Sequence, residues 1–241
     1  MSEPVGSGVG YAGERRRHAT YGLLAEWYHE PNDERISRLT ARSPGTVGID
    51  IAGLAGAADG TETLRLDHAR LFVGPFELAA PPYESVYVDR EDRVMTEATE
   101  TVRAEYRKAG LDIDIDEPAD HVAAELEFVS LLVAAEIEAL AAGESEAAEH
   151  YLRRQYEFLS EHLGRWVSGM AEHMRERADT EFYRTLGDET QRFVEADGKL
   201  LADRLDRLES GADALDVIGA LDASDTGDGH PTGTTDGGED R

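Results

Sequence analysis

Apolar residues recur at helical spacing through almost the whole second half of this 241-residue chain. Three segments, residues 118–142, 144–177 and 180–209, repeat an apolar side chain every third or fourth position, which places those side chains on one face of an α-helix. Helices of this length are stabilised in water mainly by packing such faces together. The sequence therefore predicts an all-α fold, a single-domain, bundle-like globule. The residues expected to face its core are Val122, Leu126, Val129, Val133, Ile137, Leu140, Leu152, Leu159, Leu163, Trp166, Met170, Met174, Phe182, Leu186, Phe193, Leu201, Leu205 and Leu208.

The first half is predicted to be helical in shorter pieces. Pro31 ends the first of these helices and Gly110 ends the last, because proline cannot continue a helix and glycine accepts the backbone conformation that closes one. Strand signals are nearly absent and there is no internal repeat. The predicted helices cover residues 14–30, 33–42, 47–58, 61–72 and 92–109.

Local residues predict three further features: a connector, a helix start and a bend. Residues 111–115 alternate apolar and acidic side chains, and without a partner segment they are expected to form an extended connector. Pro118 suits the first position of the next helix, with Asp116 or Glu117 as its cap. A bend near Gly164 is expected in the segment after it.

The predicted domain organisation is simple. Residues 1–13 are rich in glycine and serine and are expected to be disordered. Residues 14–209 form the helical domain. Residues 210–241 are an acidic tail rich in glycine, aspartate and threonine, also expected to be disordered, with a short helical turn allowed at residues 215–221.

Net charge excludes several classes of partner. The chain carries a formal charge of -27, and its only lysines are Lys108 and Lys199. Nucleic acids and anionic membranes both require basic patches, so neither is expected to bind. The acidic residues are spread along the chain rather than clustered, which favours adaptation to high salt as their explanation, although a cationic partner is compatible with them. The absence of cysteine excludes disulfides and thiolate chemistry.

The chain is expected to be cytoplasmic. No apolar run reaches the length of a membrane span. Three consecutive arginines at residues 15–17 raise the question of an export signal, but Glu26 and His29 interrupt the following apolar run. No small-residue cleavage site follows either, so the arginines are interpreted as the start of a helix.

A central loop is expected to be ordered. Residues 69–89 break from a helix at Gly74 and pass through a Pro-Pro pair into an aromatic segment. So many apolar residues on irregular backbone must pack against something, and ordered loops of this kind often carry binding sites. We therefore expect a long ordered loop crossing the helical core.

A second stretch, residues 116–121, opens the most apolar helix. On local grounds Asp120 is expected to cap free amides at the start of that helix. His121 shares a helical face with Glu125 and Phe128, so it could be a half-buried histidine held by a carboxylate. The functional interpretation is that Asp120 and His121 line a groove and hydrogen-bond a peptide.

Three motifs carry a resemblance to a known family. They are Leu-Phe-Val-Gly-Pro at residues 71–75, Pro-Pro-Tyr-Glu-Ser-Val-Tyr at residues 81–87 and Glu-Pro-Ala-Asp-His at residues 117–121. In order and spacing they resemble the TorD/DmsD family, cytoplasmic chaperones for the maturation of molybdenum-containing redox enzymes. The resemblance covers roughly residues 14–209. This chain departs from the family by His68, Tyr83 and Tyr87, where tryptophan is often found.

The resemblance implies a binding function without chemistry. The chain would bind the N-terminal, often twin-arginine, signal peptide of a molybdopterin oxidoreductase catalytic subunit of the dimethyl sulfoxide, trimethylamine N-oxide or nitrate reductase type. It would assist cofactor insertion and proofreading before export, as a monomer or homodimer, with no cofactor, metal or catalytic residue of its own. Glu84 would add an acidic contact. The residues implied in peptide binding are Leu71, Phe72, Pro82, Tyr83, Ser85, Tyr87, Glu117, Pro118, Asp120 and His121.

Local reasoning leaves alternatives open. From their own surroundings in the sequence, Leu71 and Phe72 are better explained as core residues. A purely structural assembly subunit is one other class of protein that fits. Another is a metal- or nucleotide-dependent helical hydrolase, although its Asp-His pairs stand in the reverse of the usual order. The residues of that hydrolase would be Asp67, His68, Asp120 and His121.

The charge of the chain generates a first prediction. Salt screens repulsion between carboxylates, so the thermal melting temperature should rise between low and molar potassium chloride. A melting temperature that stays constant or falls over this range would contradict the prediction.

Overall fold

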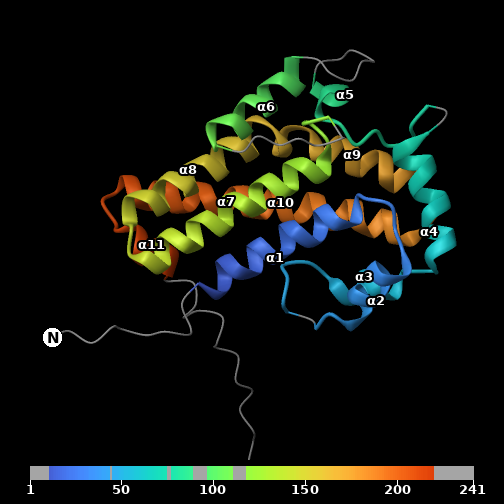
Figure 1. The fold of residues 1–241 in the computed structure, drawn as a ribbon, viewed down its shortest axis with the longest axis horizontal. Coiled ribbons are helices and arrows are strands. Elements are labelled where there is room, and N and C mark those ends of the chain that lie inside the picture. The colour runs from blue at the N-terminus through green and yellow to red at the C-terminus, as the bar shows by residue number, and fades with distance from the viewer. Residues whose placement is uncertain (1–10, 44, 75–76, 89–96, 111–117, 220–241) are drawn as a thin grey trace, which may run out of the picture.

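The computed structural model describes residues 11–43, 45–74, 77–88, 97–110 and 118–219 (Figure 1). Within these residues the regular structure is helical, and the single β-type feature is an isolated antiparallel bridge between Tyr83 and His121. The all-α prediction is confirmed. None of the described helices is both long and apolar enough to span a membrane.

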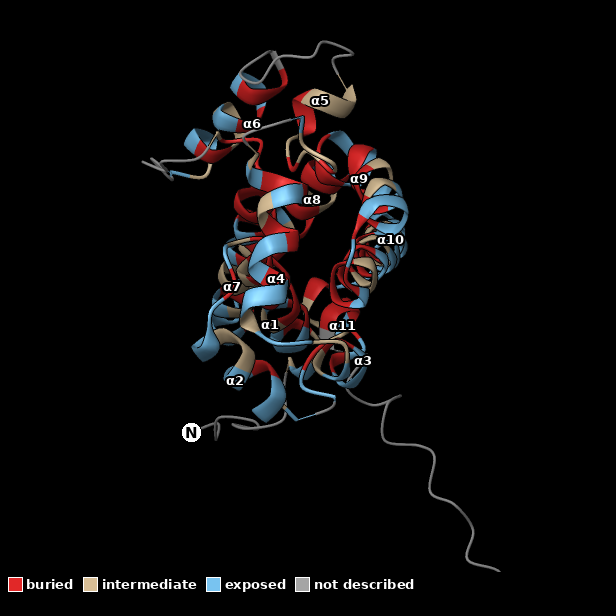
Figure 2. Ribbon diagram, turned by 90° about the vertical axis from the view of Figure 1, so that its right-hand side faces the viewer, coloured by how far each residue is buried: buried red, intermediate tan, exposed pale blue. Residues whose placement is uncertain are grey.

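Five long helices form the body of the molecule. Helix α1 packs most extensively against α7, while α10 packs against α9 and α8. Buried residues occupy the sides that face neighbouring helices, and exposed residues occupy the outer sides (Figure 2). The bounds of these helices are α1 Ala12–Trp27, α7 Val122–Ala142, α8 Ser145–Glu161, α9 Leu163–Arg177 and α10 Glu181–Glu209.

Shorter elements cover the ends of this body. Helices α5 and α6 lie over α8 and α9, and α4 lies at the opposite side from α11 (Figure 1). The π-helical turn η1 follows α4 directly. The bounds are α2 Asp33–Ala41, α3 Ile51–Gly56, α4 Thr61–His68, η1 Ala69–Val73, α5 Glu84–Val88, α6 Glu97–Lys108 and α11 Ala214–Gly219.

The predicted helix boundaries need several corrections. The helix expected over residues 47–58 is only Ile51–Gly56, because Asp50 accepts a hydrogen bond from the Gly53 amide and starts it late. The helix expected over residues 61–72 changes to π-helical pairing at Ala69. The bend expected near Gly164 is a break at His162. The connector at residues 111–115 and the start of the helix expected at residue 92 lie outside the described residues.

The start of α7 was predicted wrongly. The helix begins at Val122 rather than at Pro118, and its cap is His121, whose Nδ1 accepts a hydrogen bond from the Ala123 amide at 3.1 Å. His121 itself has extended backbone, as expected for a residue at this position. The caps proposed from the sequence, Asp116 and Glu117, lie outside the described residues.

Packing continues beyond the domain boundary expected at residue 209. Helix α11 packs against α8 and α10, and its Val217 and Ile218 are buried. This helix lies at the helical turn that the sequence allowed within the tail. The described chain ends with α11 at Gly219, so residues 220–241 remain a prediction.

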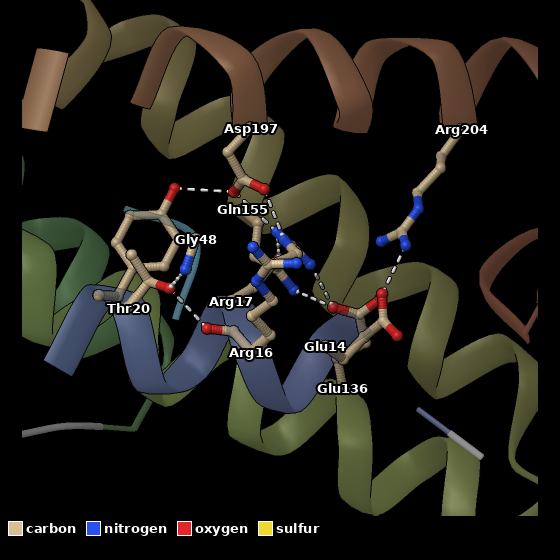
Figure 3. Close-up of polar contacts among 10 residues, drawn as sticks. Glu14, Arg16, Arg17, Thr20, Gly48, Glu136, Gln155, Asp197 and Arg204 are labelled. Atoms are coloured by element: carbon tan, nitrogen blue, oxygen red, sulfur yellow. Dashed lines mark hydrogen bonds and ion pairs between the residues drawn. The ribbon is translucent and has the colours of Figure 1, made fainter. Parts of the chain in front are cut away.

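A buried ion-pair network joins the first long helix to the last (Figure 3). The guanidinium of Arg17 on α1 donates to both carboxylate oxygens of Asp197 on α10, at 2.6 and 2.9 Å. It also donates to Gln155 on α8 at 2.6 Å and reaches Glu136 on α7 at 3.5 Å. Tyr21 donates its hydroxyl to Asp197 at 2.7 Å. One side chain therefore ties together four helices.

Burial makes this network sensitive to the loss of any member. Burial alone would lower the pKa of Arg17, but Asp197 and Glu136 raise it above its ordinary value, so the guanidinium stays charged. Burial also raises the pKa of Glu136, against the opposing effect of Arg17. A second buried pair joins Arg204 of α10 to Glu14 of α1. Removing one partner of such pairs leaves the other charge buried without compensation.

Replacing Arg17 with methionine should destabilise the fold strongly. The substitution keeps the apolar stem but strands Asp197 in the core, which typically costs about 3–5 kcal/mol. Arg15→Met is the matched control, because Arg15 lies two residues earlier on the same helix and is exposed. Urea unfolding of both variants measures the effect, and an Arg17→Met loss no greater than that of Arg15→Met would show that the network contributes little.

Candidate functional site

The central loop and the start of α7 lie against each other, as the paired motifs predicted. The Val122 amide donates to the Pro82 carbonyl at 2.9 Å, and the Glu84 amide donates to the Asp120 carbonyl at 3.0 Å. Between these two bonds, Tyr83 and His121 form the isolated bridge. Two segments separated by about forty residues in sequence therefore form one unit of structure.

Asp120 fastens the loop rather than its own helix. Its side chain is fully buried, and its Oδ2 accepts a hydrogen bond from the Ser85 amide at 3.1 Å. Ser85 lies in the first turn of α5, so Asp120 supplies a cap to a helix 35 residues away. The expectation that Asp120 caps α7 is wrong, because its carboxylate is turned toward α5. Its Oδ1 is buried without a hydrogen-bond partner among the described residues.

His121 is buried between two other rings. Its ring centroid lies 5.3 Å from that of Tyr83 and 6.4 Å from that of His29. Burial, with smaller contributions from His29 and His68, lowers the pKa of His121 to about 3. The imidazole is therefore neutral at physiological pH, consistent with its acceptor role toward the Ala123 amide. The carboxylate partner expected at Glu125 is wrong, since Glu125 accepts from the indole of Trp166 at 3.1 Å.

The other Asp-His pair, Asp67 and His68, acts in a similar way. Asp67 accepts from the Thr180 amide and hydroxyl, both at 2.8 Å, at the start of α10. His68 lies 3.2 Å from the carbonyl of Tyr28, at the end of α1. Each pair thus has an aspartate that holds the start of another helix. The four residues proposed for a hydrolase are engaged in structural hydrogen bonds.

Several residues predicted to bind peptide are buried. Leu71 and Phe72 belong to the core, where the Phe72 ring lies 5.8 Å from Tyr28 and 5.6 Å from Tyr183. Pro82 and Ser85 are buried as well. In this conformation these residues support the site from beneath.

The two tyrosines of the loop and Pro118 are the partly exposed members of the predicted set among the described residues. Tyr83 and Tyr87 are half-buried. The Tyr87 ring stacks on Trp166 at 5.5 Å, and its hydroxyl lies 3.2 Å from Nδ1 of His173. Pro118 is also half-buried, and Glu117 lies outside the described residues. The loop therefore presents two aromatic side chains held by contacts to the body.

Sequence reasoning missed an exposed apolar patch on α4 and η1. Leu66 and Val73 are 66% and 65% exposed, although large apolar side chains are usually buried. They line one hollow of about 370 Å³ together with the carboxylates of Glu30 and Glu62. The sequence contained a sign of this exposure for Leu66, because Leu66 falls on the face of the predicted helix opposite the core residue Leu64.

A cluster of buried titratable groups lies below α5. Glu84, expected to add an acidic contact, is almost fully buried, and its Oε2 lies 3.0 Å from Nδ1 of His162. Burial, and next the charge of Glu84, raise the pKa of Glu125 well above its ordinary value. Sequence analysis did not identify His162, because nothing near it in the sequence indicates that it meets Glu84.

Comparisons with known proteins agree with this architecture. A family model described as nitrate reductase delta subunit matches residues 40–172, more than half of the chain. The chain belongs to this family. Its resemblance to the TorD/DmsD redox enzyme maturation chaperones is confirmed by relatives that carry those names.

Two such relatives come from bacteria. The Tat proofreading chaperone DmsD of Salmonella paratyphi A is 34% identical over 128 residues, which cover 52% of this chain and 56% of that protein. The chaperone protein TorD of Aliivibrio fischeri is 29% identical over 149 residues, covering 61% and 68%. The chain thus spans about half the length of the Salmonella relative. Both relatives are named as chaperones rather than enzymes.

A solved structure shows the same fold. A crystal structure described as that of a candidate redox enzyme maturation protein from Archaeoglobus fulgidus superposes with a TM-score of 0.53 at 22% identity. The superposition covers 81% of this chain and 99% of that one. At this level of identity the likeness concerns the arrangement of helices.

Acid should destabilise the protein partly through His121. Between about pH 3 and the ordinary histidine pKa near 6.5, the unfolded chain binds a proton that the folded chain excludes, so folding stability falls as pH decreases through this window. His121→Asn should flatten this dependence, because asparagine can still cap α7 but does not titrate.

Urea midpoints at pH 7 and pH 5 measure the effect. His150→Asn, at an exposed histidine on α8, serves as the control. If His121→Asn loses as much stability as wild type between the two pH values, protonation of His121 is not a source of acid sensitivity.

Proposed function

We propose that this protein is a chaperone that binds the N-terminal signal peptide of a molybdopterin oxidoreductase catalytic subunit in the cytoplasm. It holds that subunit back from export while the cofactor is inserted. The observation that carries the proposal is the fastening of the Pro-Pro-Tyr loop by Asp120 and His121, the residues of the family motif. The names of the relatives, Tat proofreading chaperone and TorD, support it.

The surface of the molecule suits such a peptide. A twin-arginine signal peptide has basic residues followed by an apolar segment, so its receptor needs exposed apolar side chains flanked by carboxylates. The hollow of α4 and η1 offers Leu66 and Val73 beside Glu30 and Glu62. The Glu30 carboxylate already pairs with Arg65, whereas Glu62 is exposed on the first turn of α4.

The proposed contact surface therefore differs from the groove that the sequence predicted, which Asp120 and His121 would line. Val73 lies next to the buried Leu71 and Phe72, so the same motif supplies a supporting core on one side and an exposed apolar contact on the other. The loop places Tyr83 and Tyr87 beyond η1, and its backbone is joined to η1 by the bond from the Ala80 amide to the Leu71 carbonyl at 3.0 Å. The peptide would lie across η1 and the loop.

No catalytic step is part of this proposal. Asp67 and Asp120, the carboxylates of the hydrolase alternative, accept backbone hydrogen bonds that hold α10 and α5. Within the described residues, no three histidine, aspartate or glutamate side chains are grouped in a way that could hold a metal ion. Binding and release of the client subunit are sufficient for the proposed role.

Calorimetric titration of a client signal peptide tests the proposal. Val73→Asp should weaken binding at least tenfold without lowering the melting temperature, since Val73 is mostly exposed. Leu71→Ala is the contrasting variant, because deletion of buried side-chain atoms should lower stability by about 2–5 kcal/mol. Asp120→Ala should lower both affinity and stability, the latter by about 0.5–2 kcal/mol as a lost cap.

Leu131→Asp provides a matched control. Leu131 is the other large apolar side chain that is exposed among the described residues, and it lies on α7. If Val73→Asp and Leu131→Asp weaken binding equally, the peptide does not use the α4 and η1 hollow. If the peptide fails to bind the wild-type protein at all, the proposed function is wrong.

A further inference from the structure

A cleft lies between α5 and α6 on one side and the junction of α8 and α9 on the other. It has a volume of about 570 Å³, and an adjacent hollow of about 530 Å³ shares two wall residues with it, Glu161 and His162. Both views of the fold place α5 and α6 over this junction (Figures 1 and 2). The walls of the larger cleft are Glu84, Val88, Ala98, Thr101, Ser160, Glu161, His162 and Arg165.

The inner wall of this cleft is a carboxylate and imidazole pair. Oε2 of Glu84 lies 3.0 Å from Nδ1 of His162, and both residues are at least nine-tenths buried. A carboxylate can only accept, so the proton of this bond resides on Nδ1 of the imidazole. In the neutral ring, Nε2 is then a hydrogen-bond acceptor. That Nε2 is buried and has no hydrogen-bond partner among the described residues.

A second buried carboxyl group, that of Glu125, lies beside Glu84. Burial, and next the charge of Glu84, raise the pKa of Glu125, which favours the protonated form of Glu125. Its Oε1 is also buried without a partner among the described residues.

Carboxyl and imidazole groups lie at the base and the rim of the cleft. Glu84 and His162 lie at its base, and the exposed carboxylate of Glu161 lies at its rim. Arg165 is the cation among its wall residues, and its Nη1 donates to the backbone carbonyl of Glu161 at 3.2 Å. A guanidinium group, with five donors in one plane and a permanent charge, matches acceptors placed in this way.

The backbone conformation at the junction of α8 and α9 sets the position of His162. Helix α8 ends at Glu161 and α9 begins at Leu163, so His162 is the residue at which the two helices are broken. A Cβ atom at Gly164 would lie 2.5 Å from the carbonyl oxygen of Leu159. Only glycine fits there, and any other residue would move the junction that carries His162.

We propose that this cleft binds a guanidinium group through Glu84 and His162, and that it receives an arginine side chain of the client peptide. The identity of the occupant rests on the proposed function, whereas the guanidinium site rests on the cleft itself. The apolar part of the same peptide would lie across η1 and the loop. The cleft would then add an electrostatic contact to that apolar one.

Titration with the dipeptide acetyl-Arg-Arg-amide tests the site. Long-range ¹H–¹⁵N spectra report on the imidazole nitrogens, and the Nε2 resonance of His162 should shift on addition of the dipeptide. Acetyl-Lys-Lys-amide should shift it far less, because an ammonium group lacks the planar fork. Equal shifts with both dipeptides, or shifts confined to other residues, would overturn the proposal.

Three variants locate the binding. Glu84→Gln removes the charge but keeps an acceptor for Nδ1 of His162, and it should weaken dipeptide binding at least tenfold. Val88→Phe fills the cleft from its wall without altering the buried pair, so it tests the site even if Glu84→Gln folds poorly. Glu146→Gln, at an exposed position on α8, is the control. Wild-type affinity in both Glu84→Gln and Val88→Phe would overturn the proposal.

The client peptide separates this proposal from the proposed function. If Glu84→Gln loses the dipeptide but binds the complete signal peptide as well as wild type does, the arginine of the client is not the occupant. If the signal peptide fails to bind wild type while the dipeptide binds, the proposed function is wrong and the guanidinium site stands. If Glu84→Gln loses affinity for the signal peptide while Glu146→Gln keeps it, the result supports both the guanidinium site and the proposed function.

Discussion

The bond between Arg17 and Asp197 fixes the position of the first helix between α7 and α10, and other features of the structure depend on it. A charge buried this deeply permits one alignment of α1, because a slip along the helix would leave it uncompensated. The end of α1 is set by that alignment. There the carbonyl of Tyr28 meets His68, and His29 lies beside His121. The floor of the candidate site is thus positioned from the opposite end of the helix.

The two Asp-His pairs show how conspicuous motifs can act from beneath a surface. Asp67 holds α10 and Asp120 holds α5, each through backbone amides at the first turn of a helix distant in sequence. A carboxylate in this position satisfies orphan amides and complements the helix dipole. The motif residues therefore determine where Tyr83 and Tyr87 lie without themselves being open to a ligand. A substitution in such a motif would displace the loop.

The fold could be predicted from the sequence because helical periodicity is a local signal, and long helices such as α7 and α10 repeat it many times. The site could be predicted only in part. That Asp120 would cap α5 instead of α7 depends on a contact across 35 residues, which no local pattern contains. The same holds for the meeting of Glu84 with His162.

The burial of Arg17 has a consequence for a protein proposed to recognise paired arginines. Its own chain carries three in a row, at residues 15–17, ahead of an apolar run. In the folded state the third is enclosed by Asp197 and Gln155, and the second donates to the carbonyl of Val47. Folding thus buries the third arginine and holds all three on helix α1, while Arg15 and Arg16 stay on its exposed side. Under the proposed function, an extended arginine run of this kind would be presented only by an unfolded copy, because in the folded protein the three residues belong to a helix.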